Sequence, residues 1–204
     1  MQDQMLDAGY DRAAGGWAEG LRRLGYDRAY RVFLRRVLAQ GHARVCDVGT
    51  GAGDLALAYV AVMGAPEDLV LVDASAGMLA VARERLGRGR PVKARLGQFD
   101  DAAGFDLVLA GHVIEHCPDP GLAMRQLARL VRPGGQIVLI VSKPHWCQWL
   151  IWLRWRHRWF SATSIVELAE AAGLLPDTTL PFETGAPRRT SLGYLFTKPK
   201  GETK

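Results

Sequence analysis

Residues 44–54 read RVCDVGTGAGD, a short apolar run that leads into a turn with glycine at every second position. Glycine lets the backbone turn sharply, and it lets a ligand lie against bare amides without meeting a β-carbon. A helical pattern with Asp54 at its start follows and runs to Met63. This stretch predicts a buried strand, a turn that can hold a ligand, and a helix, in that order.

Strand-like and helix-like segments alternate along most of the chain. The strand candidates are short β-branched or aliphatic runs at residues 44–47, 69–72, 92–96, 105–110, 136–141 and 191–197. Runs that are apolar throughout suit parallel strands that are covered on both faces. The alternation therefore predicts a doubly wound parallel sheet, to which the terminal strand can be added antiparallel.

Capping residues mark where several helices begin and end. Ser75 can cap the second helix, and Asp119 in front of a proline opens another, which the Arg-Pro-Gly-Gly sequence at 132–135 closes. Ser164 and Glu167 have capping-box spacing ahead of a later helix. We expect these side chains to supply the hydrogen bonds that the first turns of the helices lack.

Composition limits the class of protein. The chain has 204 residues, of which 49% are hydrophobic, and a net charge of +5. These values fit one domain with an ordinary core, and the charge excess is too small to predict a nucleic-acid partner. The three cysteines are far apart, the start lacks the pattern of a signal peptide, and polar residues interrupt the longest apolar stretch, 136–153. We therefore expect a cytoplasmic protein without a transmembrane helix.

An acidic residue follows the glycine turn at a distance that suits a nucleoside ligand. Asp73 ends the second predicted strand, 20 residues after Gly53, where a carboxylate can accept both hydroxyls of a ribose. The glycines are spaced G-x-G-x-G, whereas a dinucleotide fold requires G-x-G-x-x-G/A. Asp47, two residues before the first glycine, favours a cation near the turn and disfavours a pyrophosphate. S-adenosylmethionine (SAM) is therefore favoured over NAD, and a turn that only packs helix on strand is the alternative.

Four motifs in order now resemble those of class I SAM-dependent methyltransferases. They are DVGTGAGD at 47–54, LVDASAGMLAVA at 71–82, FDLVLAGHVIEH at 105–116 and LVRPGG at 130–135. The most similar group is the small-molecule enzymes that include quinone-biosynthesis methyltransferases. The resemblance covers about residues 44–141, with a weaker similarity at 158–174. It implies a Rossmann-like, doubly wound, seven-stranded sheet with helices on both faces and the last strand antiparallel.

The resemblance also implies a domain organisation and a function. We expect one domain over residues 1–204, with a helical preface at 7–40, a cofactor-binding core at 44–141, a tryptophan-rich lid at 143–160, and a C-terminal helix and strands at 161–198. The implied activity is in-line transfer of a methyl group from SAM to a small or lipophilic acceptor such as a quinone precursor, isoprenoid or lipid, with S-adenosylhomocysteine as the product. A SAM-binding module without catalysis and an NAD-dependent oxidoreductase are the alternatives. The oligomeric state is not predicted.

The resemblance implies a role for each matching residue. The methionine end and backbone of the cofactor would be held by Asp47, Gly49, Thr50, Gly51 and Gly53. The ribose would bind Asp73, the adenine would lie near Ala74 and Met78, and the floor beneath the sulfonium would be Ala110, Gly111 and His112. The family usually has Gly-Asp after the third strand to meet the adenine amino group. Gln98 and Phe99 follow Gly97 here, so an amide replaces the acid.

Two histidines are the catalytic candidates. Methyl transfer needs alignment and exclusion of water, and it needs a base only when the acceptor must lose a proton. His112 lies just past the fourth strand and could be that base or a structural residue. His116 follows Glu115 and more often supports the loop in this family, and His145 is a further candidate. No ligand spacing for a metal is present, so no metal is expected.

The segment between Trp146 and Phe160 is unusually rich in tryptophan. Five of the six tryptophans lie within 14 residues, and three arginines stand near its end. Tryptophan and arginine together suit the membrane–water interface, and a tryptophan-rich cover also suits a large apolar substrate pocket. We expect either peripheral membrane contact, a lid over a lipophilic substrate, a core helix that covers the sheet, or a protein interface.

Overall fold

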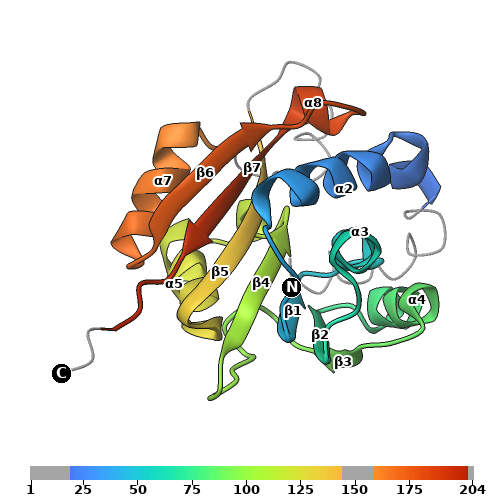
Figure 1. The fold of residues 1–204 in the computed structure, drawn as a ribbon, viewed down its shortest axis with the longest axis horizontal. Helices are drawn as coiled ribbons and strands as arrows, with labels where there is room; N and C mark the ends of the chain where they lie inside the picture. The colour runs from blue at the N-terminus through green and yellow to red at the C-terminus, as the bar shows by residue number, and fades with distance from the viewer. Residues whose placement is uncertain (1–18, 144–158, 202–204) are drawn as a thin grey trace.

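The six predicted strands, together with a seventh at residues 175–181 that was not predicted, form one seven-stranded sheet at the centre of the molecule (Figure 1). The computed structural model describes residues 19–143 and 159–201. The strands are β1 (Arg44–Val48), β2 (Asp68–Asp73), β3 (Arg90–Lys93), β4 (Phe105–Gly111), β5 (Val131–Ser142), β6 (Leu175–Pro181) and β7 (Ser191–Thr197). The helices are α2 (Tyr26–Val37), α3 (Asp54–Met63), α4 (Ala76–Leu86), η1 (Ile114–His116), α5 (Pro120–Leu130), α7 (Ala162–Ala171) and α8 (Pro187–Thr190).

The strand order confirms a doubly wound sheet. It is β3-β2-β1-β4-β5-β7-β6, so the order reverses between β1 and β4. Strands β1 to β5 pair in parallel, whereas β7 is inserted antiparallel between β5 and β6. The expected antiparallel last strand is therefore confirmed. Ligands of such sheets bind outside the carboxyl ends of the strands, near the point of reversal.

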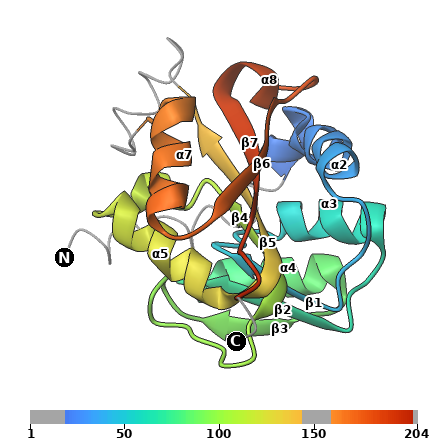
Figure 2. The same ribbon diagram turned by 60° about the vertical axis from the view of Figure 1, so that its left-hand side comes forward.

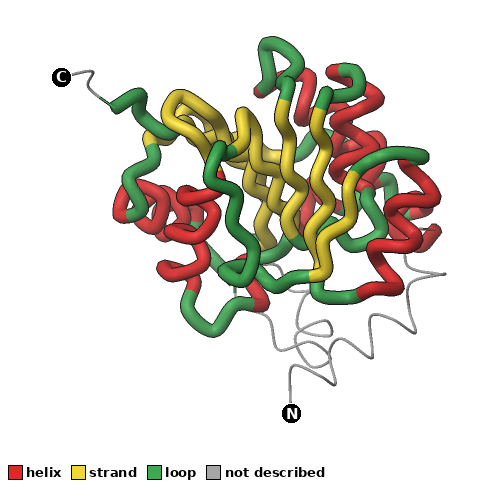
Figure 3. Tube along the Cα trace, turned by 90° about the horizontal axis from the view of Figure 1, so that it is seen from below, coloured by secondary structure: helices red, strands yellow, loops and turns green. Residues whose placement is uncertain are grey.

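Helices cover both faces of the sheet. Helices α2, α3 and α4 lie on one face, and α5 and α7 lie on the other (Figure 2), with the strands between the two groups (Figure 3). Successive strand residues pack into opposite halves of the core: Val108 into the half beneath α5 and α7, and Leu109 into the half beneath α2 and α3. Both are fully buried. This is why the central strands β1, β2, β4 and β5 have long apolar runs rather than apolar residues at alternate positions, whereas the edge strands β3 and β6 are mostly exposed.

Two of the predicted helix caps are present. The Ser75 hydroxyl accepts from the Met78 amide at the start of α4, and the Asp119 carboxylate accepts from the Leu122 amide at the start of α5. The start of α7 differs from the prediction, because Ser161 is its N-cap and accepts a hydrogen bond from the amide of Ser164. The capping side chain therefore lies three residues before the predicted position.

Two strand boundaries also differ from the sequence prediction. Strand β3 begins at Arg90 and ends at Lys93, whereas 92–96 was expected. The Arg-Pro-Gly-Gly sequence at 132–135 belongs to β5, which starts directly after α5. The end of α5 is held from a distance, because the Lys198 ammonium donates to the carbonyl oxygens of Ala128 and Val131. No local pattern could have indicated that contact.

Within residues 19–143 and 159–201, no helix is long and apolar enough to cross a membrane. Residues 7–18 of the expected preface and most of the expected lid, 143–160, lie outside the described residues. The division into four parts stays a prediction. Trp159 is described and is 40% exposed.

Candidate cofactor and acceptor site

Strand register brings three predicted site residues to one edge of the sheet. Val48 pairs with Val72 on one side and with Ala110 on the other. The next residue on each strand is Gly49, Asp73 or Gly111. The glycine turn, the second acidic motif and the floor residue of β4 therefore stand side by side at the carboxyl edge, beside the point where strand order reverses. Ala110 is fully buried and supports this edge from below.

Backbone hydrogen bonds hold the glycine turn against β2. The Thr50 amide donates to the Val72 carbonyl oxygen at 3.0 Å, and the Gly53 amide donates to the Thr50 carbonyl oxygen at 2.8 Å. Gly49, Gly51 and Gly53 all have positive φ angles, of 63°, 51° and 82°. L-residues with a side chain rarely adopt this conformation, so the turn requires its glycines.

The three glycines face different surroundings. A β-carbon at Gly49 would lie 2.6 Å from a methyl group of Val113, and one at Gly53 would lie 3.1 Å from Ala82. These two glycines allow close packing of the protein on itself. A β-carbon at Gly51 would meet no atom within 4 Å among the described residues. Gly51 is thus the position where the bare backbone faces open space that a ligand can fill.

Asp73 lies beside that open space and holds the turn. One carboxylate oxygen accepts from the Gly51 amide and the other from the Ser75 amide, both at 2.8 Å. A carboxylate offers about four acceptor positions. The side chain is only partly buried. Its position at the end of β2, next to the turn, is the one that ribose recognition requires.

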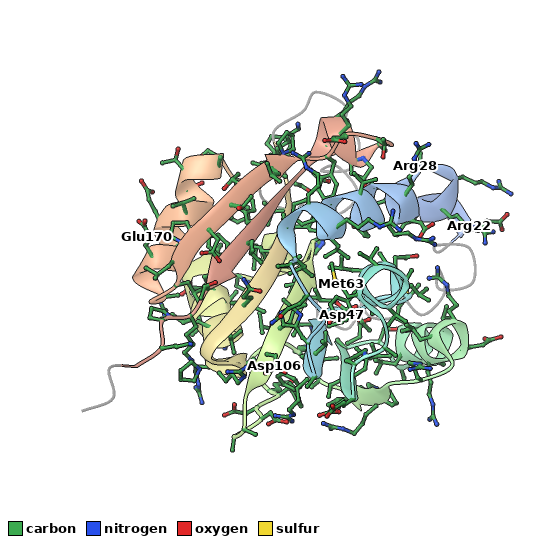
Figure 4. The ribbon with its side chains drawn as sticks, viewed as in Figure 1. Arg22, Arg28, Asp47, Met63, Asp106 and Glu170 are labelled. Atoms are coloured by element: carbon green, nitrogen blue, oxygen red, sulfur yellow. The ribbon has the colours of Figure 1, made fainter. Side chains whose placement is uncertain are left out.

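Asp47 is a buried acid beneath the turn. It is 1% exposed, and Figure 4 shows it in the interior of the molecule, close to α3. Its carboxylate accepts from the Thr50 hydroxyl at 2.7 Å. Burial raises the pKa of the Asp47 carboxyl to about 7, and the nearby carboxylates of Asp73 and Asp54 act in the same direction, against the hydrogen bonds from Thr50 and the Ala56 amide. Three carboxyl groups around one turn favour a cationic ligand and disfavour a pyrophosphate.

Sequence analysis missed an arginine that supports the turn. The Arg85 guanidinium on α4 donates to the Ala52 carbonyl oxygen at 2.6 Å and to the Asp54 carboxylate at 2.8 Å. The two hydrogen bonds tie the turn and the start of α3 to α4. Arg85 is 31 residues from Asp54 and has no motif of its own, so no local signal predicts this contact.

The expected adenine side is only partly assembled. Met78 is buried and packs with Ala52 of the turn, and Ala74 is partly exposed beside Asp73. Gln98 is exposed, and its side-chain carbonyl oxygen accepts from the Arg95 amide at 3.1 Å, which closes a local turn. Phe99 packs against the core beside Phe105. The contacts of the Phe99 amide and of Gln98 with adenine stay predictions.

His112 stands on strained backbone at the end of β4. Among the described residues, His112 is the non-glycine residue whose φ angle is positive, at 56°. Its amide donates to the Ile140 carbonyl oxygen at 2.8 Å, and its side chain is 26% exposed. Left-handed backbone costs an ordinary residue about 1–3 kcal/mol, and such strain clusters at functional sites. His112 directly follows Gly111, and the role of both in the floor beneath the sulfonium stays a prediction.

A buried glutamate contacts the His112 ring. Glu115 Oε1 lies 3.0 Å from His112 Nδ1 and accepts from the Ser142 amide at 2.7 Å. Burial alone would raise the pKa of the Glu115 carboxyl, but the hydrogen bonds and charge of His112 and the Ser142 amide outweigh it, and the pKa is lowered. Glu115 Oε2 is buried and meets no donor among the described residues. Sequence analysis noted Glu115 only as the neighbour of His116.

The other ring nitrogen of His112 faces one hydroxyl group. Nε2 lies 3.5 Å from Ser191 Oγ, the outer limit of a hydrogen bond, and the Tyr26 ring packs edge-on 6.4 Å away. Serine, histidine and glutamate thus lie in the order of a hydrolytic triad. Ser191 is fully buried, however, so it cannot serve as a nucleophile for an external substrate.

The second histidine candidate directly follows Glu115 in the chain. His116 ends η1 and is exposed, and its catalytic role stays a prediction. His145 and four of the five clustered tryptophans lie outside the described residues. Within the part of the chain that the structure describes, no three His, Cys, Asp or Glu side chains are grouped as metal ligands.

A family model and curated relatives match this chain over part of its length. A family model described as a methyltransferase domain matches residues 14–177. The ubiquinone/menaquinone biosynthesis C-methyltransferase UbiE of Cellvibrio japonicus (strain Ueda107) is 34% identical over 114 residues, which are 52% of this chain and 45% of that protein. The chain spans about half the length of the curated relatives it matches.

Solved structures with the same fold cover nearly the whole chain. A putative methyltransferase in complex with the Haloferax volcanii Trm112 methyltransferase activator has a TM-score of 0.77 at 18% identity, over 93% of this chain and 97% of that one. The Burkholderia thailandensis 1,6-didemethyltoxoflavin-N1-methyltransferase, solved with 1,6-didemethyltoxoflavin and S-adenosylhomocysteine bound, has a TM-score of 0.74 at 19% identity, over 98% of this chain and 89% of that one. At these identities the likeness shows a shared fold.

Proposed function

The chain belongs to the class I SAM-dependent methyltransferase family, and from this premise we propose that it transfers a methyl group from SAM to a small organic acceptor. The observation that carries the proposal is the open space over the Gly51 backbone, which is bordered by the Asp73 carboxylate. A nucleoside needs bare amides and a ribose acceptor side by side, and both are present at the carboxyl edge of the sheet.

The residues around this space fit SAM better than a dinucleotide. SAM carries a sulfonium and an ammonium group, and the turn carries the carboxyl groups of Asp47, Asp54 and Asp73. Asp54 is paired with Arg85, whereas Asp47 is buried with a hydroxyl and an amide as its partners. A buried carboxyl group without a cationic partner gains most from a bound cation. NAD would instead bring a pyrophosphate toward these carboxyl groups.

Each part of the site has a proposed role. Asp47, the glycine turn and Thr50 would hold the methionine end of SAM, and Asp73 would accept hydrogen bonds from the ribose. Met78 and Ala74 would lie along the adenine, and Ala110 and Gly111 would form the floor beneath the sulfonium. When bound, SAM supplies an activated methyl group. The chain's own work is to align the acceptor with that methyl group, exclude water and hold a proton.

The acceptor side is proposed to lie over the end of β4, where His112 could remove a proton from the acceptor. The quinone-related relative makes an aromatic quinone precursor a reasonable acceptor. The tryptophan-rich segment after β5 would then cover an apolar molecule. Because that segment lies outside the described residues, its proposed contacts with substrate or membrane rest on its sequence alone.

Calorimetry followed by a transfer assay tests the proposal. SAM and S-adenosylhomocysteine should bind with micromolar affinity, whereas NAD should not bind. Protein with methyl-labelled SAM is then incubated with phenols, enols, carboxylic acids and amines, including quinone precursors, and label in the acceptor is counted. Binding of NAD instead of SAM would contradict the cofactor assignment. Binding of SAM without transfer to any acceptor would favour a SAM-binding module.

A further inference from the structure

The contacts of Glu115 decide where the neutral His112 ring carries its proton. Glu115 Oε1 already accepts from the Ser142 amide, and the same oxygen lies 3.0 Å from His112 Nδ1. The lowered pKa of the Glu115 carboxyl keeps it ionised at neutral pH, and an ionised carboxylate has no proton to donate. The proton in the Nδ1···Oε1 contact therefore belongs to Nδ1. Nε2 is then the nitrogen with a lone pair.

Few other groups compete for that lone pair. Among the described residues, the titratable groups that contact the ring are Glu115 from η1 and Tyr26 from α2. Of the two hydroxyl groups at the ring, Ser142 Oγ at the end of β5 lies 3.2 Å from Nδ1, and Ser191 Oγ at the start of β7 faces Nε2. Burial raises the pKa of Tyr26, in spite of hydrogen bonds with Thr190 and Ser191, so its phenol stays neutral. Ser191 reaches Nε2 only at 3.5 Å.

The cluster also has the rigidity that a base requires. Glu115 is 1% exposed at its side chain, and η1 and the end of β5 fix it from two sides. His112 keeps an unfavourable backbone conformation, and the hydrogen bond from its amide to the Ile140 carbonyl oxygen holds it there. The His112 ring is thus positioned at the expense of backbone strain, beside the sheet edge that carries the proposed SAM site. Such an arrangement is typical of catalytic groups.

We infer that Glu115 is a positioning residue that keeps the proton of His112 on Nδ1, so that Nε2 takes a proton from the acceptor, which is a hydroxyl compound of the phenol or enol class. This inference rests on the proposed methyl transfer. The acceptor's O–H proton passes to Nε2, and its oxygen bonds to the methyl carbon. The methyl–sulfur bond breaks, and its electron pair stays on sulfur. The Glu115 carboxylate balances the charge of the imidazolium that forms.

The acceptor class follows from the pKa of the group to be methylated. A phenol titrates near pH 10, so it is mostly protonated at neutral pH and needs a base. A carboxylic acid titrates near pH 4 and is already ionised, so a positioned base would give it no advantage. Preference for hydroxyl acceptors over carboxylates is therefore a consequence of the His112–Glu115 pair.

Nitrogen NMR tests the tautomer without any acceptor. In ¹⁵N-histidine-labelled protein saturated with S-adenosylhomocysteine, the signal of neutral His112 should show the proton on Nδ1. The signal is assigned with His112→Gln. A proton on Nε2 in the unsubstituted protein would overturn the inference, even if SAM binds and methyl transfer occurs.

Kinetics separate positioning from a purely structural role. Glu115→Gln keeps the shape of the side chain but removes its charge, so kcat with the hydroxyl acceptor should fall at least about tenfold. KM for SAM should change less than about twofold, and the acid limb of the pH–rate profile should move to lower pH because the imidazolium loses its counter-charge. Glu170→Gln makes the same change on the exposed face of α7 and is the control (Figure 4).

Three results would overturn the inference in this experiment. The first is a pH profile of Glu115→Gln that matches that of the unsubstituted protein. The second is an equal loss of kcat and SAM affinity in a variant whose thermal unfolding is unchanged. The third is transfer to carboxylates in preference to phenols and enols. Failure of SAM to bind would instead refute the proposed function itself. If Glu115→Gln does not fold, Ser142→Ala takes its place. This variant leaves the hydrogen bond from the backbone amide of residue 142 to Glu115, so kcat should fall less than tenfold.

Discussion

The Asp73 carboxylate accepts a hydrogen bond from the Gly51 amide across 2.8 Å, although 22 residues separate the two along the chain. The acid at the end of β2 therefore shapes the turn that follows β1. Because Gly51 is also the glycine whose α-carbon faces open space, one side chain both holds the turn and borders the proposed ligand. We therefore expect ribose binding at Asp73 to be coupled to the order of the turn.

Replacing Gly51 with alanine should separate ligand binding from stability. The new methyl group meets no atom of the described residues within 4 Å, but it enters the space in which SAM is proposed to lie. SAM affinity, measured by calorimetry, should fall at least about tenfold, because bare backbone is what allows close approach. Gly173→Ala is the matched control, since Gly173 also has a positive φ and open surroundings but lies beyond α7. Equal SAM affinity in the two variants would show that Gly51 does not face the ligand.

Asp47 should make stability depend on pH in a defined direction. Its pKa is about 7 in the folded protein and about 4 when unfolded, so the folded state binds a proton more tightly. The contribution of Asp47 to the free energy of unfolding is greatest below about pH 4. It falls by about 1.4 kcal/mol per pH unit as the pH rises toward 7. Asp47→Asn lacks this loss, so its stability relative to the unsubstituted protein should rise between pH 5 and 7 and level off above.

Urea unfolding at several pH values measures this difference. Asp100→Asn, at a side chain that is 64% exposed, is the control for a general change of charge. Parallel pH dependence of the unsubstituted protein and Asp47→Asn would mean that the carboxyl group is not held in its neutral form by burial.

The backbone of His112 should reveal its strain in a pair of variants. At a φ of 56°, alanine pays the left-handed penalty that glycine escapes. Glycine loses more entropy on folding, which offsets part of this gain. His112→Gly should therefore be more stable than His112→Ala by about 1 kcal/mol in urea unfolding. Since both variants remove the imidazole, the difference reports the backbone alone. A more stable alanine variant would show that the turn after β4 is not strained.

The sheet and the cofactor edge were predictable because their signals are local. The glycine turn at 49–53 and the acid Asp73 are short patterns whose chemistry dictates the geometry around them. Strands that are apolar on both faces favour a doubly wound sheet, because helices on each side then bury the side chains of the central strands. The caps at Ser75 and Asp119 were predictable for the same reason, because each acts within three residues.

Contacts between distant segments were not predictable. Arg85 reaches the turn from another helix, and Lys198 ends α5 from the far end of the chain. The bond from Ser142 to Glu115 spans 27 residues, and it depends on how far β5 extends. The sequence identified His112 as a candidate base, but the group that orients it became visible only when β4, β5 and η1 were placed together.

The most direct test of the central claim is the affinity of Asp73→Ala for SAM. The change removes hydrogen bonds from the ribose to a charged acceptor, so the binding free energy should weaken by about 2–4 kcal/mol in calorimetry. Asp73→Asn, which keeps one oxygen for the Gly51 or Ser75 amide, should lie between the two, and thermal unfolding of each variant shows whether the fold is retained. A folded Asp73→Ala variant that binds SAM as tightly as the unsubstituted protein would contradict the assignment of this edge as the cofactor site.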